Sequence, residues 1–205
     1  MLDVISIRNK INQMAELAFS MLVSTFDGLM KHDLDKLAHV LKEENKLNDI
    51  ERSLSFSLVQ VSKEKSQTVD KNYIGLLADI IADLEEIGDY IKDMIERIEI
   101  KIQEELFFSE EALSEYRQLY NVVKAALFDV VKSLKMNNKN LAKKILGNEE
   151  RVDKLLVKYR AAHTKRLLSG VCDPRAGNMF LNLLDFTVQV FHHTKTIANN
   201  ILDLK

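Results

Sequence analysis

The stretch that decides the fold is LLADIIADLEEIGDYIKDMIERI, residues 76–98. Its apolar residues recur at steps of three and four, which is the period of an amphipathic α-helix with one buried face. They are Leu77, Ile80, Ile81, Leu84, Ile87, Ile91, Met94, Ile95 and Ile98. Glu85 and Asp89 lie one turn apart beside this apolar stripe, with Gly88 between them. Because glycine costs roughly 1 kcal/mol inside a helix, Gly88 predicts either a close neighbour or a ligand that needs room.

The same period predicts five further helices, so the chain is expected to be all-α. The six expected ranges are about 4–30, 33–61, 73–106, 109–134, 141–168 and 178–205. Polar segments at 62–72 and 169–177 are expected loops, the second because it holds the only proline and two of the six glycines. Short connections between successive helices favour antiparallel packing in a bundle.

Composition limits the class of protein. Of the 205 residues 46% are apolar and one is proline, which is enough for long helices around a real core. The 29 basic and 31 acidic residues nearly balance, and no basic stripe with interleaved aromatic residues appears, so no nucleic-acid partner is expected. No apolar run reaches the roughly 18–20 residues that cross a bilayer, and the N-terminus does not resemble a signal peptide. The single Cys172 fits a reducing compartment.

The two halves of the chain repeat each other. A shift of 105 residues aligns Leu29 with Leu134, and a shift of 103 residues aligns Met94 with Ile197. Internal repetition of a three-helix unit follows from these matches. We therefore predict two tandem three-helix bundles, residues 1–107 and residues 108–205.

Three of the expected helices carry a polar pair, four residues apart, beside the apolar stripe. The pairs are Glu44 with Asn48, Glu85 with Asp89, and Glu149 with Asp153. Facing carboxylates repel unless a cation lies between them, and their oxygens suit hard cations such as iron, manganese, magnesium or calcium. In the last helix His192 stands where Asp89 stands in the first half, and a neutral imidazole can replace a carboxylate as ligand. The alternative interpretation is a solvated acidic face without a ligand.

Signatures of common enzymes are missing from the sequence. It contains no phosphate-cradling glycine loop, no nucleophile elbow, no HExxH and no paired CxxC. Cys172 has no evident basic partner, and His163 falls on the apolar face of its helix, where we expect a partnered core histidine. The sequence therefore predicts a protein that is not an enzyme.

The segment ADLEEIGDYIKDMIE, residues 82–96, resembles the third-helix signature of PhoU-type proteins, which is roughly DLERIGDHAxNIAE. The matching residues are Asp83, Leu84, Glu85, Ile87, Gly88 and Asp89, whereas Glu86 and Tyr90 replace Arg and His. The later segment RAAHTKRLLSGVCDPRAGNMFLNLLDF, residues 160–186, is similar to the PhoU domain at the C-terminus of bacterial sodium/phosphate cotransporters. The resemblance covers essentially the whole chain.

The resemblance implies two three-helix bundles and a role in phosphate homeostasis through protein contacts. Family members can bind multinuclear iron or other metals through paired E(D)xxxD motifs. Carried onto this sequence, two motifs are complete, whereas Asn48 replaces one final carboxylate, and Val188 and His192 replace the acidic pair of the last helix. We expect iron or another divalent metal first at Glu44, Asn48, Glu85 and Asp89, and a weaker, mixed-ligand or empty site at Glu149, Asp153 and His192.

Three functional hypotheses follow. The first is a cytoplasmic regulatory domain of a sodium-dependent phosphate transporter, held at the inner face of the cell membrane by the transporter portion of the same or another chain. The second is a free-standing PhoU-like regulator that couples a phosphate permease to a sensor kinase. The third is a metal-dependent hydrolase on a helical bundle, although the sequence offers no clear general base. A homodimer is compatible with the resemblance.

Overall fold

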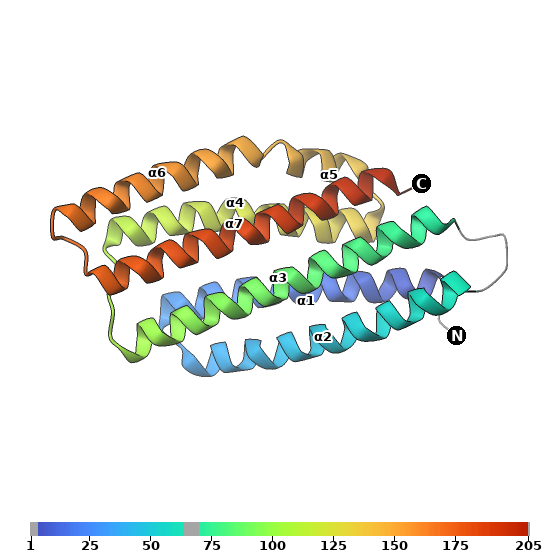
Figure 1. Cartoon of the computed structure of the whole chain (residues 1–205), viewed down its shortest axis with the longest axis horizontal. Helices are drawn as coiled ribbons and strands as arrows, with labels where there is room; N and C mark the ends of the chain where they lie inside the picture. The colour runs from blue at the N-terminus through green and yellow to red at the C-terminus, as the bar shows by residue number, and fades with distance from the viewer. Residues whose placement is uncertain (1–3, 64–69, 205) are drawn as a thin grey trace.

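The computed structural model describes residues 4–63 and 70–204, and its regular structure is helical throughout. The helices are α1 (Val4–Lys31), α2 (Leu34–Lys63), α3 (Lys71–Gln103), α4 (Glu110–Met136), α5 (Lys139–Leu146), α6 (Glu149–Leu168) and α7 (Pro174–Asp203). They run along one long axis, with α1, α2 and α3 on one side and α4 to α7 on the other (Figure 1). The described residues form no strand, which confirms the all-α fold class.

The two groups of helices share one core. Helices α1, α2 and α3 contact one another, and α4 contacts α5, α6 and α7. The most extensive contact between two helices joins α3 to α7, which run side by side through the middle of the molecule (Figure 1). Buried apolar residues of both groups therefore belong to one continuous cluster. The division into residues 1–107 and 108–205 stays a prediction.

The apolar stripe of α3 lies in the core, as its period predicts. All nine of its apolar side chains are at most 3% exposed. A Cβ atom added at Gly88 would lie 3.0 Å from Cδ2 of Leu47 in α2, so glycine lets the two helices approach closely. A close neighbour therefore accounts for Gly88.

Backbone geometry repeats along the chain together with the sequence. Helix α1 ends at Lys31 and α4 ends at Met136, 105 residues later. The next residue in each case, His32 or Asn137, has a positive φ, 54° and 50° respectively. Side-chain oxygens of asparagine and aspartate often cap the helix that follows such a turn, and Asn138 accepts a hydrogen bond from the backbone N–H of Asn140.

The expected fifth helix is broken in two. Helix α5 ends at Leu146 and α6 begins at Glu149, with Gly147 and Asn148 between them. Glycine and asparagine are both poor residues for a helix interior. The Asn148 side chain donates a hydrogen bond to the Lys144 carbonyl at 3.1 Å, so it satisfies one of the acceptors that the end of α5 leaves free.

The last helix begins earlier than predicted, at Pro174 instead of residue 178. Asp173 accepts hydrogen bonds from the backbone N–H groups of Arg175 and Ala176 at 2.8 and 3.0 Å, which makes it the N-cap. Proline fits the first turn because its missing N–H would have no helical partner there. The expected loop at 62–72 is shortened by both flanking helices, and its residues 64–69 lie outside the described residues.

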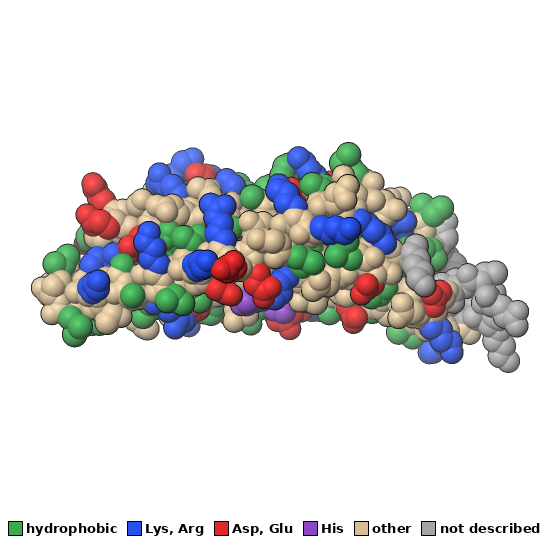
Figure 2. All heavy atoms as spheres, turned by 90° about the horizontal axis from the view of Figure 1, so that it is seen from above, with side chains coloured by type: hydrophobic (Ala, Val, Ile, Leu, Met, Phe, Trp, Pro, Cys, Tyr) green, Lys and Arg blue, Asp and Glu red, His purple; other side chains and the backbone are tan. Residues whose placement is uncertain are grey.

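The surface fits the balanced charge of the sequence. Figure 2 shows basic and acidic side chains interspersed along one face of the elongated molecule. Within residues 4–63 and 70–204, no helix combines the length and the apolar character that crossing a membrane requires.

Candidate metal centres between the bundle helices

The first candidate centre lies where α2 faces α3 beside Gly88. Glu44 of α2 is 3% exposed, and Glu85 and Asp89 of α3 are half-buried. Burial is the main cause that raises the pKa of both Glu85 and Asp89, and the charge of Glu44 adds to the rise at each. The structure thus places the predicted carboxylates along the contact between α2 and α3, but, among the described residues, not in a group that could hold a metal ion.

Negative charge accumulates at this centre. Burial is the main cause that raises the pKa of Glu85, followed by the charges of Asp89, Glu86 and Glu51. Burial also raises the pKa of Asp89, and the charge of Lys92 opposes this rise. Such a site favours a bound proton or a bound cation over bare carboxylates.

Asn48 supplies an oxygen that has no partner. Its Nδ2 donates to Oε1 of Glu44 at 2.7 Å, which directs the amide oxygen away from that carboxylate. The oxygen, Oδ1, is buried and accepts no hydrogen bond from any residue that the structure describes. A buried acceptor without a donor is unfavourable, and a hard cation would satisfy it.

Lys92 partly fills the place of a cation. Its Nζ lies 3.6 Å from Oε1 of Glu44. In the part of the chain that the structure describes, no group of three or more His, Cys, Asp or Glu residues is placed to hold a metal ion. The donor chemistry therefore suits a hard cation, but the carboxylates would have to converge and displace Lys92. Metal binding here stays a prediction.

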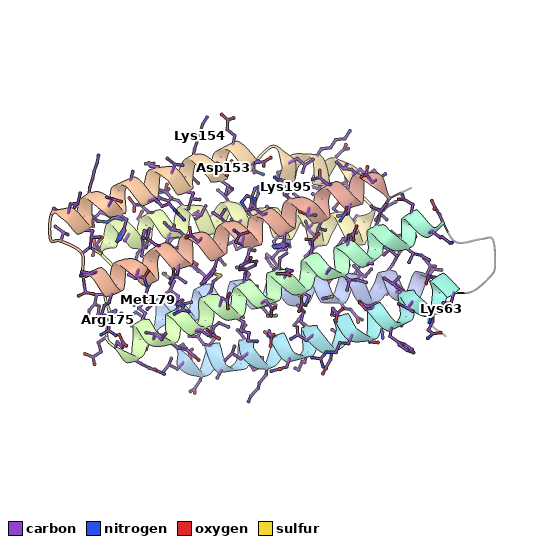
Figure 3. All side chains as sticks on the ribbon, viewed as in Figure 1. Lys63, Asp153, Lys154, Arg175, Met179 and Lys195 are labelled. Carbon is purple, nitrogen blue, oxygen red and sulfur yellow. The ribbon has the colours of Figure 1, made fainter. Side chains whose placement is uncertain are left out.

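The second candidate centre, between α6 and α7, is more open. Glu149 pairs with Lys195 of α7, and this hydrogen bond is the main cause that lowers the pKa of Glu149. His192 lies near enough to lower that pKa further, whereas Asp153 is exposed on α6 (Figure 3). Val188, which replaces the missing acidic residue, is 4% exposed and belongs to the core. The structure thus brings Glu149 and His192 together and leaves Asp153 outside.

Each of the two centres contains a glutamate–lysine ion pair that the sequence pattern does not predict. Glu44 and Glu149 are 105 residues apart, and their partners Lys92 and Lys195 are 103 residues apart. Each pair joins the second part of a repeat to its last helix. The two repeat shifts were the signal that could have found these lysines.

A polar contact between α3 and α7 was also missed. Asp83 Oδ1 lies 2.8 Å from Nδ1 of His193, and both side chains are largely buried. The rings of Tyr90 and His193, which the 103-residue shift aligns, lie 5.6 Å apart. The ring contact between Tyr90 and His193 therefore joins the two repeats at corresponding positions.

His163 and Cys172 form a small cluster beside the N-terminus of α7. His163 is 2% exposed, which confirms it as a core histidine. Its Nδ1 lies 4.0 Å from Sγ of Cys172, so the cysteine does have a basic neighbour, contrary to the sequence analysis. Burial nevertheless raises the pKa of the Cys172 thiol, which disfavours the nucleophilic thiolate.

Comparisons with known proteins match part of the sequence and nearly the whole fold. The PhoU domain model matches residues 11–98. No curated protein matches the chain. PhoU from Pseudomonas aeruginosa is 18% identical, with a TM-score of 0.87 over 97% of this chain and 94% of that one. The phosphate transport system regulatory protein PhoU from Streptococcus pneumoniae is 12% identical, with a TM-score of 0.84 over 97% and 92% of the two chains.

A PhoU-like protein from Shewanella oneidensis MR-1 is also similar, at 12% identity and a TM-score of 0.60 over 93% of this chain and 95% of that one. The chain therefore has the all-helical PhoU fold over nearly its whole length. The PhoU domain match to residues 11–98 includes every predicted ligand of the first candidate metal centre.

Proposed function

We propose that this chain regulates phosphate uptake through protein contacts and not through catalysis. The observation that carries the proposal is the agreement with PhoU from Pseudomonas aeruginosa, at a TM-score of 0.87 over 97% of this chain. The PhoU domain match to residues 11–98 supports the same role independently. The similar protein from Streptococcus pneumoniae is described as a phosphate transport system regulatory protein.

The comparisons favour a regulator that couples a phosphate permease to a sensor kinase over a domain of a sodium-dependent phosphate transporter. The chain matches 94% and 92% of two proteins that are themselves named PhoU. We therefore place this reading first and the transporter domain second. The expected partners are the permease, the sensor kinase and a second copy of the chain, and the expected location is the inner face of the cell membrane.

The proposed organisation is two PhoU-type repeats, residues 1–107 and 108–205. The repeated left-handed turn at His32 and Asn137 and the repeated glutamate–lysine pairs support this division. Packing of α3 on α7 would then be the interface through which a change in one repeat reaches the other.

The proposed cation site is the first candidate centre, with iron or another divalent metal held by Glu44, Asn48, Glu85 and Asp89. The raised pKa values of Glu85 and Asp89 and the unpartnered Asn48 oxygen support it. Elemental analysis should find less metal in Glu85→Ala plus Asp89→Ala than in Glu149→Ala plus Asp153→Ala. The reverse order would refute the assignment, and a metal-free wild type would refute the metal proposal.

Binding to membrane vesicles tests the proposed contact with the phosphate permease. Inverted membrane vesicles from the native host should retain the purified chain, whereas vesicles from a strain without its phosphate permease should retain much less. Inverted vesicles expose the cytoplasmic face of the membrane to the solution. A tagged chain that is added to them can therefore reach the permease without detergent. Equal retention by both kinds of vesicle would contradict a contact with the permease.

A further inference from the structure

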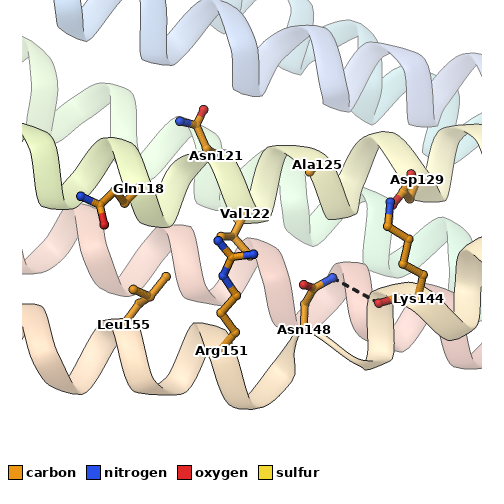
Figure 4. A pocket seen from close by; sticks show the side chains of 9 residues that line it. All are labelled: Gln118, Asn121, Val122, Ala125, Asp129, Lys144, Asn148, Arg151 and Leu155. Atoms are coloured by element: carbon orange, nitrogen blue, oxygen red, sulfur yellow. Dashed lines mark hydrogen bonds and ion pairs between the residues drawn. The ribbon is translucent and has the colours of Figure 1, made fainter.

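A hollow of about 360 Å³ lies between α4 and the break that separates α5 from α6 (Figure 4). We call it the α4–α6 hollow, and its lining includes Gln118, Val122, Asp129, Lys144, Arg151 and Leu155. Pockets that bind small molecules typically measure about 300–1,000 Å³. The hollow shares no residue with either candidate metal centre.

The charge of the hollow is positive. Asp129 is 7% exposed, and its Oδ2 accepts a hydrogen bond from Nζ of Lys144 at 2.7 Å, so this carboxylate is already neutralised. Within residues 4–63 and 70–204, Arg151 makes no hydrogen bond or ion pair. Its side chain extends from α6 toward Val122 of α4 (Figure 4). One guanidinium group is therefore left free in the hollow.

Further hydrogen-bond donors line the same hollow. Oε1 of Gln118 accepts from the Tyr159 hydroxyl at 2.9 Å, which fixes the amide and leaves its Nε2 free to donate. Lys144 uses one of its three N–H donors on Asp129 and keeps the others. Val122 and Leu155 add apolar lining to the same space. The hollow thus offers donors to an anion and an apolar wall to a carbon skeleton.

The corresponding place in the first repeat carries more negative charge, although Lys46 stands where Arg151 does. Helix α2 runs without a break through the positions that match Gly147 and Asn148. The asparagines Asn121 and Asn148, which line the hollow, correspond to Glu16 and Glu43 at the 105-residue shift. The second repeat therefore carries neutral amides where the first carries carboxylates that would repel an anion.

We propose that the α4–α6 hollow binds a small organic phosphate, such as a nucleoside or sugar monophosphate. Its phosphate group lies on Arg151 and Lys144, because the planar guanidinium binds phosphate oxygens in pairs and lysine adds a second charge. Its carbon skeleton covers Val122 and Leu155, which inorganic phosphate would leave exposed to water. This proposal concerns a ligand of the second repeat and does not depend on the regulatory role.

Isothermal titration of the purified chain tests the proposal with AMP, glucose 6-phosphate and glycerol 3-phosphate as probes. At least one probe should bind saturably at one site per chain, and its dephosphorylated form should not. Arg151→Gln should weaken that binding by at least about tenfold, since a hydrogen bond to a charged group is lost. Ala125→Phe, which fills the hollow from an exposed position of α4, should abolish it without lowering the Tm.

Arg52→Gln is the matched control, because Arg52 is an exposed arginine of α2 in the other repeat. This variant should bind the probe as the wild type does. The proposal is overturned if none of the three probes binds, or if Arg52→Gln weakens binding as much as Arg151→Gln. It is also overturned if inorganic phosphate binds as tightly as the best probe.

Discussion

Replacing Glu85 by Gln and Asp89 by Asn should stabilise the metal-free protein, although both carboxylates are predicted metal ligands. A like-charged pair four residues apart on a helix costs about 0.2–0.5 kcal/mol. Both groups are also half-buried, and burial raises their pKa values, so desolvation adds a comparable cost. The double variant should therefore gain about 0.5–1 kcal/mol of unfolding free energy. For a chain of this size that gain corresponds to a Tm higher by about 1–4 °C.

The dependence on pH follows from the raised pKa values. Above the ordinary values of 3.8 for Asp and 4.5 for Glu, the folded protein holds protons on these groups that the unfolded chain has lost. The protonated Glu85 and Asp89 therefore stabilise the fold fully at a pH below their ordinary pKa values. This stabilisation is lost as the pH rises through their raised pKa values. In urea unfolding at a series of pH values from about 3.5 upward, the stability of the wild type should decline more steeply than that of the variant.

A divalent cation should reverse the order of stability. Excess Mn²⁺ should raise the Tm of the wild type and leave the Glu85→Gln plus Asp89→Asn variant unchanged, because a ligand stabilises only the state that binds it. The matched control, Asp79→Asn plus Glu96→Gln, removes two charges from exposed positions of the same helix. The reasoning is refuted if the metal-free double variant is less stable than the wild type while this control is unchanged.

Two further predictions concern single residues. Lys92→Met should lower the free energy of unfolding in urea by about 1–2 kcal/mol, because buried Glu44 loses its cationic partner. Added Mn²⁺ should restore part of this loss, and a stability equal to that of the wild type would contradict the pairing. Gly177→Ala should cost about 1–3 kcal/mol, since the new Cβ would lie 2.6 Å from Cε1 of His163. Gly75→Ala meets nothing within 4 Å and should instead stabilise α3 by about 0.5–1 kcal/mol, so equal effects of the two glycine changes would refute the packing argument.

The fold was largely predictable because periodicity and packing agree. The stripe of α3 is apolar at the helical period, and the same residues are buried. The errors arose where one residue type fits two structures. The sequence pattern places Pro174 in a loop, but proline also suits the first turn of a helix, where the structure has it. The pattern likewise continues a helix through Gly147 and Asn148, where the structure ends α5.

The candidate sites were less predictable because they depend on which helices face one another. The period places Glu85 and Asp89 on one flank of α3, but only the packed structure shows Lys92 beside Glu44. Likewise Asp83 and His193 are 110 residues apart, and neither has a local signal of their contact. Lys101 stands at the end of a helix in sequence, yet it is 3% exposed, lies 3.3 Å from His32, and has a pKa lowered by burial. Contacts between segments that are distant in the sequence depend on how the helices pack, and a local sequence pattern does not predict this packing.

The uptake of radiolabelled phosphate by the native host tests the regulatory role most directly. We expect cells that lack the chain to take up phosphate faster in phosphate-rich medium than wild-type cells, because the permease is no longer restrained. The intact chain, supplied on a plasmid, should return uptake to the wild-type rate. Uptake that is the same with and without the chain, in both phosphate-rich and phosphate-poor medium, would contradict the proposed function.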